Sequence, residues 1–354
     1  MKNLLKFLTF SLLLALVTTS CSSDDDLVIP PVSLGDYANG YFVLNEGNGN
    51  PATASVTFVS DEGLVEDDVF RIVNPDADEI GTYLQDMFFD DTRAFIISGS
   101  ANQVTVVDRF TFEYITTVNT DFSAPRYGTV VNDKAYVTNS NDWSTGNDDF
   151  VTVIDLNDYT TSIINIGDYS EKILSDNNNV IIANGYFGSG NAATIMNTNN
   201  QETTSIDFGV GNSPNSMEEK DDILYVLTYN YASNGKIFVI DLDTNLITST
   251  IDLPSALGET KNLKIENSNI YFTVGASVYL MSLESNVVPT DPILTYSTTS
   301  QYGVMYGFDV EDDKIYISDG GDFNSNSNTY EYSLNGDLLN TVTAGVGPNS
   351  FHFN

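Results

Sequence analysis

A repeat of about 45 residues constrains the fold of this chain more than any other feature of its sequence. A short apolar segment of the type YFVLN recurs seven times, beginning at residues 41, 94, 135, 180, 224, 270 and 315. Successive starts are separated by 53, 41, 45, 44, 46 and 45 residues. Spacing this regular indicates one structural unit repeated along the chain.

Each repeat contains three further segments with the character of β-strands. A second apolar segment, such as VTVIDLND at 151, follows the first and ends in Asp, Asn and Gly, which favour turns. A third segment returns, such as DVFRIV at 68 or ITSTIDL at 247, and a fourth precedes the first, such as RYGTVV at 126. No window shows a sustained helical period with caps. The pattern predicts four-stranded antiparallel meanders of the size of β-propeller blades.

The two ends of the repeat region predict how a ring of blades closes. The first repeat begins at Tyr41 with its second strand, so it lacks an innermost strand. The last residues, GPNSFHFN at 347–354, are similar to SPNSMEEK at 213–220, which begins another repeat. We therefore expect an all-β fold, a seven-bladed β-propeller over residues 39–354 that the C-terminal strand closes, because closure protects sheet edges.

The N-terminus has the layout of a lipoprotein signal peptide. Residues 1–20 comprise a basic head, an apolar run of about eleven residues and small residues before Cys21, the only cysteine. The run is too short to span a membrane, which takes roughly twenty residues. The sequence CSSDDD that follows resembles the signal that exports lipoproteins of Bacteroidetes-type bacteria to the cell surface. We expect Cys21 to carry lipid, residues 21–38 to form a flexible tether, and the protein to be exposed on the outer membrane.

Composition excludes several classes of function. Removing Lys2 and Lys6 from the 13 basic residues leaves 11 against 49 acidic residues, a field that repels nucleic acid. With Cys21 lipidated, no thiol remains for a disulfide or a thiolate metal site. The single histidine, His352, falls in the expected closing strand, where we predict that it is packed and not catalytic. Turns rich in Asp and Asn at 141–149 and 319–326 offer oxygens to Ca²⁺, but neither has EF-hand spacing. We expect no enzymatic activity and no resident cofactor.

Long connections are expected to gather on one face of the ring. The segments between the first two apolar strands of a repeat, such as NSNDWSTGNDD and DGGDFNSNSN, are long, while most turns of the other face are tight. Long loops cost ordering entropy and usually carry function. The aromatic side chains of these long loops either suit a flat or amphipathic ligand or pack the loops onto the blades. Basic groups at the starts of the innermost strands either meet an anionic group or offset nearby aspartates. The candidate ligand-binding residues are Trp143, Tyr186, Phe187, Tyr229, Tyr231 and Phe323 in the loops and Arg126, Tyr127, Asn215 and Tyr306 at the strand starts, where Lys172, Lys261, Asn262 and Asn349 also lie.

One repeat carries a family resemblance. The unit at 213–253, with PNS, LYVLT and KIFVIDLDTNLITSTIDL, resembles the YncE-like seven-bladed propellers, and the resemblance extends over nearly all of residues 40–354. Combined with the lipoprotein signal, it is similar to Bacteroidetes surface propellers of the BtuG type. This resemblance implies capture of cobalamin, a corrinoid nutrient, and its transfer to a TonB-dependent outer-membrane transporter. The aromatic and Asn-rich face formed by the long loops is compatible with a corrinoid, but also with a glycan, a haem or a siderophore.

Two other functions remain as alternatives. The same face would serve a protein–protein interaction scaffold of the cell envelope. A propeller enzyme, such as a lyase or a quinoprotein-like dehydrogenase, is disfavoured by the single histidine.

Overall fold

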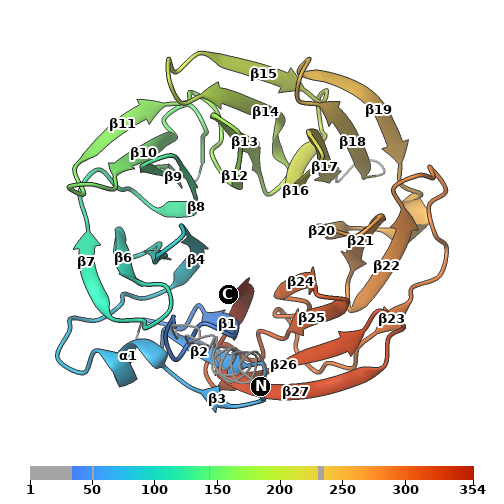
Figure 1. Cartoon of the computed structure of the whole chain (residues 1–354). Coiled ribbons are helices and arrows are strands. Elements are labelled where there is room, and N and C mark those ends of the chain that lie inside the picture. The colour runs from blue at the N-terminus through green and yellow to red at the C-terminus, as the bar shows by residue number, and fades with distance from the viewer. Residues whose placement is uncertain (1–33, 50–51, 143, 230–234) are drawn as a thin grey trace, which may run out of the picture. The chain divides into compact units, whose positions relative to one another are not determined.

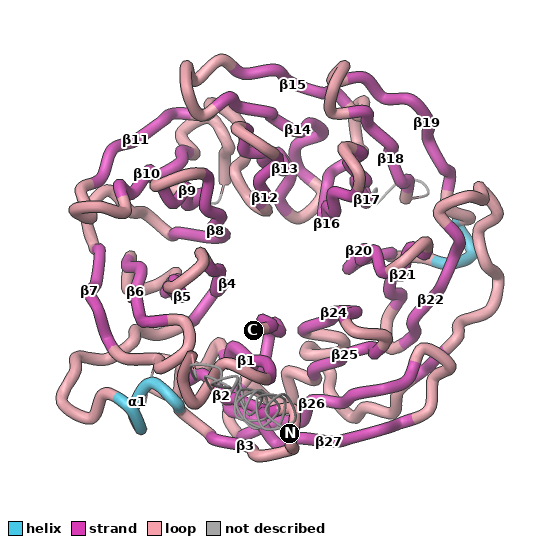
Figure 2. The backbone as a smooth tube through the Cα atoms, viewed as in Figure 1, coloured by secondary structure: helices cyan, strands magenta, loops and turns pink. Residues whose placement is uncertain are grey.

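This computed structural model describes residues 34–354, except 50–51, 143 and 230–234. The described residues form seven four-stranded antiparallel sheets. Figure 1 shows the sheets arranged as a ring, and Figure 2 shows that strands dominate over helix. The described helices are short: α1 spans Val69–Val73 and the 3₁₀ helix η1 spans Ser255–Leu257. The prediction of a seven-bladed β-propeller is therefore confirmed.

Each sheet is one blade, and the blades follow the chain in order. Blade 1 has the strand order β28-β1-β2-β3, and blades 2 to 7 each take four successive strands from β4 to β27. The innermost strands of blades 1 to 7 are β28 (Pro348–Phe353), β4 (Leu84–Phe89), β8 (Pro125–Val131), β12 (Ile173–Asp176), β16 (Ser213–Lys220), β20 (Thr260–Glu266) and β24 (Gly307–Glu311). The second strands are β1 (Gly40–Asn45), β5 (Arg93–Ser98), β9 (Lys134–Asn139), β13 (Asn179–Tyr186), β17 (Ile223–Tyr229), β21 (Asn269–Val274) and β25 (Lys314–Ser318).

The outer half of each blade follows the same order. The third strands are β2 (Ser55–Ser60), β6 (Gln103–Asp108), β10 (Phe150–Asp155), β14 (Ser189–Asn197), β18 (Lys236–Asp241), β22 (Ser277–Ser282) and β26 (Asn326–Ser333). The outermost strands are β3 (Val65–Glu66), β7 (Tyr114–Val118), β11 (Thr161–Asn165), β15 (Thr203–Asp207), β19 (Leu246–Asp252), β23 (Leu294–Thr295) and β27 (Leu338–Val346).

The C-terminal strand closes the ring, as the sequence predicted. β28 pairs antiparallel with β1, and Tyr41 lies opposite Phe353. Asn354 secures the end, because its backbone N–H donates to the Gly40 carbonyl and its side-chain oxygen accepts from Arg109 Nε at 2.6 Å. Each innermost strand contacts the innermost strand of the next blade around the whole circuit. The blades are thus held in sequence without a free innermost edge.

The core lies between the blades. Because successive side chains of a strand point to opposite faces, a strand that is covered on both sides must be apolar at nearly every position. In β5, Ala94 and Ile96 pack toward blade 1, whereas Phe95 and Ile97 pack toward blade 3. All four side chains are fully buried. Among the described residues, seven such clusters fill the seven junctions between neighbouring blades.

Two short segments differ from the sequence-based expectation. Residues 68–73, predicted as the outer strand of blade 1, instead contain helix α1, and the outer strand is reduced to β3. The Asp68 side chain accepts a hydrogen bond from the Arg71 N–H, which caps the helix start. The compact unit begins at Leu34, and Tyr37, placed in the tether by the sequence analysis, packs edge-on against Phe58 at 5.0 Å. Within the described residues, no helix has the length and apolar character of a bilayer span.

Candidate functional site

A cavity of about 990 Å³ occupies the centre of the ring. It is lined by residues of all seven innermost strands and by the connections of one face. Seven of the ten candidate ligand-binding residues line it. Phe323 lines a neighbouring pocket, and Trp143 and Tyr231 fall outside the described residues, as does Cys21. The seven are Arg126, Tyr127, Tyr186, Phe187, Asn215, Tyr229 and Tyr306.

β-Bulges explain why polar side chains reach this central cavity. The pairing of the innermost strands shifts register near their N-terminal ends in blades 1, 2, 3, 5 and 6. A bulge inserts an extra residue, bends the strand and re-aims the side chain. The bulged residues that line the central cavity are Gln85, Arg126, Tyr127, Asn215, Asn262 and Asn349.

Two of the bulged amides also join neighbouring blades. Asn215 Nδ2 donates to the Thr260 carbonyl at 3.0 Å, and Asn349 Nδ2 donates to the Leu84 carbonyl at 2.8 Å. The side-chain oxygen of Asn215 is buried and accepts no hydrogen bond from the described residues. A buried acceptor without a partner is costly, and a ligand donor at this position would satisfy it.

Arg126 anchors one side of the mouth of the central cavity. Its guanidinium donates to both carboxylate oxygens of Glu171, at 3.0 and 3.1 Å, and also to the Gln85 side-chain oxygen. The arginine and glutamate side chains are only 16% and 11% exposed. Burial lowers the pKa of Arg126 and the Glu171 charge raises it, with a net rise, so the guanidinium stays charged. The sequence analysis singled out Arg126 but missed both partners.

Tyr306, which also lines the central cavity, donates a short hydrogen bond to Glu46. Burial, and then the Glu46 charge, raise the pKa of Tyr306 above its ordinary value, so the hydroxyl stays protonated. The Tyr306 ring meets the Phe323 ring edge-on, with centroids 5.0 Å apart. Phe323 therefore supports the wall of the central cavity from behind.

The blade 4 side of the mouth is aromatic. The connection at 184–192, NGYFGSGNA, was predicted as a long loop, but it continues the β13–β14 hairpin, in which Tyr186 pairs with Ser189. Phe187 and Gly188 form its two-residue turn with φ values of 43° and 82°, both positive as in a type I′ turn. The Tyr186 and Phe187 rings meet edge-on at 4.6 Å, and Phe187 is 78% exposed. The hairpin thus presents an apolar tip beside the central cavity.

The three lysines of the central cavity differ in their surroundings. The Lys172 ammonium lies 3.9 Å from the centroid of the Tyr127 ring. Lys261 pairs with Glu259 at 2.9 Å near the surface. Lys264 bridges Glu218 at 3.1 Å and Asp309 at 3.0 Å, and so links blades 5, 6 and 7. The sequence analysis could not predict this group of Lys264, Glu218 and Asp309, because carboxylates occur in every repeat of so acidic a sequence.

Burial also shifts the pKa of two further titratable groups of this cavity, His352 and Asp86. Burial lowers the pKa of His352 to about 3, and its Nε2 shares a hydrogen bond with the Ser350 hydroxyl at 2.8 Å. Burial raises the pKa of Asp86 to about 6, although it accepts from the Gly128 N–H at 3.0 Å. The described part of the chain contains no group of three or more His, Cys, Asp or Glu side chains arranged to hold a metal ion.

Comparisons with known proteins place the fold more firmly than the function. No family model and no curated protein matches the sequence. A quinoprotein alcohol dehydrogenase-like protein from Bacteroides thetaiotaomicron is similar in structure, with a TM-score of 0.67 and 14% identity over 90% of this chain and 78% of that one. BamB from Moraxella catarrhalis has a TM-score of 0.51 and 14% identity over 87% and 84% of the two chains. Virginiamycin B lyase from Staphylococcus aureus has a TM-score of 0.53 and 11% identity over 73% and 83%. At these identities the similarity defines the class, a β-propeller protein, and nothing narrower.

Proposed function

We propose that this protein is a surface-anchored, non-enzymatic capture protein whose central cavity binds a small nutrient, with a corrinoid as the leading candidate. It would hand that nutrient to a TonB-dependent outer-membrane transporter. The observation that carries the proposal is the gathering of seven candidate residues, chosen for their loop or strand-start positions, around one cavity of about 990 Å³. That volume is at the upper end of the range for small-molecule sites.

The chemistry of the mouth favours a ligand with both a flat apolar face and amide groups. Aromatic rings of the candidate residues from blades 3, 4, 5 and 7 border the central cavity, and such rings offer large contact area at a low entropy cost. Amides from the bulges supply donors and acceptors, among them the unpartnered Asn215 oxygen. A corrinoid is a macrocycle edged with carboxamides, so its donors match such acceptors. This complementarity is what distinguishes it from a haem, whose edge carries carboxylates.

The pairing of charged groups favours binding over catalysis. Arg126, Lys264 and Tyr306 are each held by a carboxylate, and His352 has a pKa far below neutrality. General acid–base catalysis needs a group that exchanges protons near the working pH. Asp86, with a pKa of about 6, is the exception, and it is held by a backbone N–H. Enzyme names among the structural neighbours carry over the fold alone at 14% and 11% identity.

The test is a binding screen on the full chain purified in detergent. We expect cyanocobalamin to raise the melting temperature, whereas haem, a ferric siderophore and neutral glycans should raise it less. Replacing Tyr186, Phe187 and Tyr229 with Ala together should weaken the binding at least about tenfold. Tyr114→Ala, on the outer strand β7 and 44% exposed, is the matched control and should bind normally.

Two outcomes would count against the proposal. Retention of full affinity by the triple variant would show that the ligand binds elsewhere. Failure of every compound, together with co-purification of an envelope protein, would favour the interaction scaffold, for which the 78% exposed Phe187 ring offers a contact. The anchor is tested separately, because Cys21→Ser should move the protein from the membrane fraction to the soluble fraction.

A further inference from the structure

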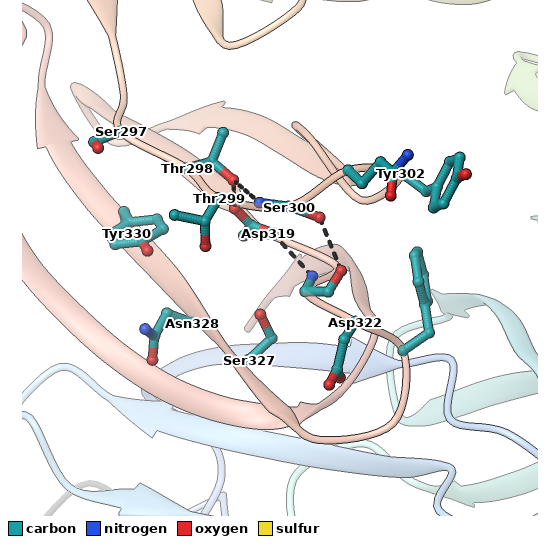
Figure 3. Close-up of a pocket in the computed structure, with 13 residues that line it drawn as sticks. Ser297, Thr298, Thr299, Ser300, Tyr302, Asp319, Asp322, Ser327, Asn328 and Tyr330 are labelled. Atoms are coloured by element: carbon teal, nitrogen blue, oxygen red, sulfur yellow. Dashed lines mark hydrogen bonds between the residues drawn. The ribbon is translucent and has the colours of Figure 1, made fainter.

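A second cavity, here called the side pocket, lies on the same face of the ring and has a volume of about 530 Å³. It is formed by residues 297–302, before β24, and by residues 319–330, which include the connection between β25 and β26 (Figure 3). Phe323 lines the side pocket and contacts Tyr306 of the central cavity edge-on. The two cavities are therefore neighbours with separate linings.

The lining of the side pocket does not suit an anion. None of the described residues that form it is Lys, Arg or His. The chain as a whole carries a formal net charge of −36. A phosphate, sulfate or carboxylate would meet a negative field with no cation to pair with.

The two carboxylates of the side pocket are already engaged. Asp319 is 6% exposed and accepts from the Thr298 hydroxyl, the Tyr296 hydroxyl at 3.4 Å and the Gly321 N–H at 2.9 Å. Asp322 accepts from the N–H groups of its own turn, which lower its pKa. These oxygens hold the walls of the side pocket, so much of their acceptor capacity is already used by internal hydrogen bonds.

Uncharged polar groups remain for a ligand. The hydroxyls of Thr299 and Ser327 and the Nδ2 of Asn328 make no hydrogen bond to the described residues, and Figure 3 shows these side chains around one space. The Asn328 side-chain oxygen accepts from Thr343 at 3.1 Å, which identifies Nδ2 as the outward donor. Two hydroxyls and one amide offer both donors and acceptors to a polar, uncharged molecule.

Two tyrosine rings complete the lining. Tyr302 is 80% exposed at the rim, and Tyr330 is partly buried deeper in the side pocket. A ring presents a flat apolar face together with a polar hydroxyl. Only a ligand with its own apolar face, such as the C–H face of a pyranose, can use both kinds of group at once.

The walls are rigid without a ligand. Ser300 Oγ donates to the Gly321 carbonyl at 2.8 Å, and the Gly320 N–H donates to the Gly303 carbonyl at 2.8 Å. The two connections approach so closely that a Cβ on Gly303 would lie 2.6 Å from the Gly320 Cα. A preformed site loses little entropy on binding.

We propose that the side pocket binds a neutral carbohydrate, with the sugar packed against Tyr330 and its hydroxyls paired with Thr299, Ser327 and Asn328. The proposal is independent of the nutrient in the central cavity. It gives the same face a second specificity, for an uncharged, polyhydroxylated group.

The test is isothermal titration calorimetry of the full chain with maltose, cellobiose, mannobiose and N-acetyllactosamine. Digalacturonic acid and glucosamine serve as the anionic and cationic controls. We expect at least one neutral disaccharide to bind with a Kd between about 10 μM and 1 mM, and the charged sugars to bind at least about tenfold more weakly. Tyr330→Ala and the isosteric Thr299→Val should each weaken binding about tenfold, whereas Tyr330→Phe and the distant Tyr114→Ala should not.

The proposal is overturned if none of the four neutral sugars binds at about 10 mM, or if binding is unchanged in both Tyr330→Ala and Thr299→Val. Stronger binding of a charged sugar would also overturn it. Binding of cyanocobalamin is measured on the same variants and should be unaffected. Failure of the side pocket and failure of the central cavity are thereby told apart.

Discussion

Removing the Lys264 ammonium should destabilise three blades at once. Its Nζ lies 3.1 Å from Glu218 and 3.0 Å from Asp309, and the variant Lys264→Met keeps the length of the side chain without its charge. Breaking a buried pair from one side costs about 3–5 kcal/mol, because a charge is left uncompensated. The three side chains are 30%, 28% and 17% exposed to the cavity, which places the cost at the lower end, about 3 kcal/mol. That corresponds to a change of about a hundredfold in the unfolding equilibrium.

The loss of stability in Lys264→Met should depend on pH in a defined direction. Burial raises the pKa of Glu218, and Lys264 lowers it, so the variant's Glu218 pKa rises further. A carboxyl whose pKa is higher in the folded state adds stability as pH falls, because the folded form binds the proton more tightly. The difference in the free energy of unfolding between wild type and Lys264→Met should therefore become smaller as the pH falls from about 7 to about 5.

Urea denaturation followed by far-ultraviolet circular dichroism measures both effects. The matched control is Lys134→Met, on an exposed residue of β9 for which the described residues provide no ion pair. A loss no larger than that of the control, or a gap that widens at lower pH, would refute the reasoning.

Three other changes test separate parts of the structure. Gly128→Ala would place a Cβ 2.0 Å from the Phe88 ring and should cost about 1–3 kcal/mol by urea denaturation; an unaltered midpoint would contradict the packing. Burial raises the pKa of Asp149 to about 7, so the melting temperature of the wild type should rise as the pH falls from about 8 to about 5. The variant Asp149→Asn should lose most of this rise, and parallel melting-temperature profiles for wild type and variant would contradict the role of Asp149. Deleting residues 348–354 removes β28 with the buried Phe351, and hydrogen exchange of β1 should then accelerate at least about tenfold, whereas unchanged protection would argue against ring closure.

The fold could be predicted because its signal is repeated and two-sided. Strands covered on both faces read as short apolar runs, and their regular spacing revealed seven blades. The similarity of residues 347–354 to 213–220 revealed the closing strand. Residues 68–73 were misread because six residues, of which four are apolar, do not distinguish a strand from one turn of helix. There the Asp68 cap was the overlooked signal.

The site was only partly visible in the sequence. Rings in long connections and polar groups at strand starts could be noticed, since such positions are expected on one face. The bulges could not, because a bulge adds one residue and leaves the apolar pattern almost unchanged. Glu171 and Glu46 were missed because acidic residues occur throughout the chain. Phe323 was expected among the ligand-binding residues of one site, but its connection folds toward the side pocket and not into the central cavity.

The most direct test of the central claim is a crystal structure of the full chain with cyanocobalamin. The account predicts corrinoid density in the central cavity, in contact with the Tyr186–Phe187 hairpin and with a donor near the Asn215 side-chain oxygen. Density on the opposite face of the ring, at the outer strands, or nowhere at saturating ligand would contradict it.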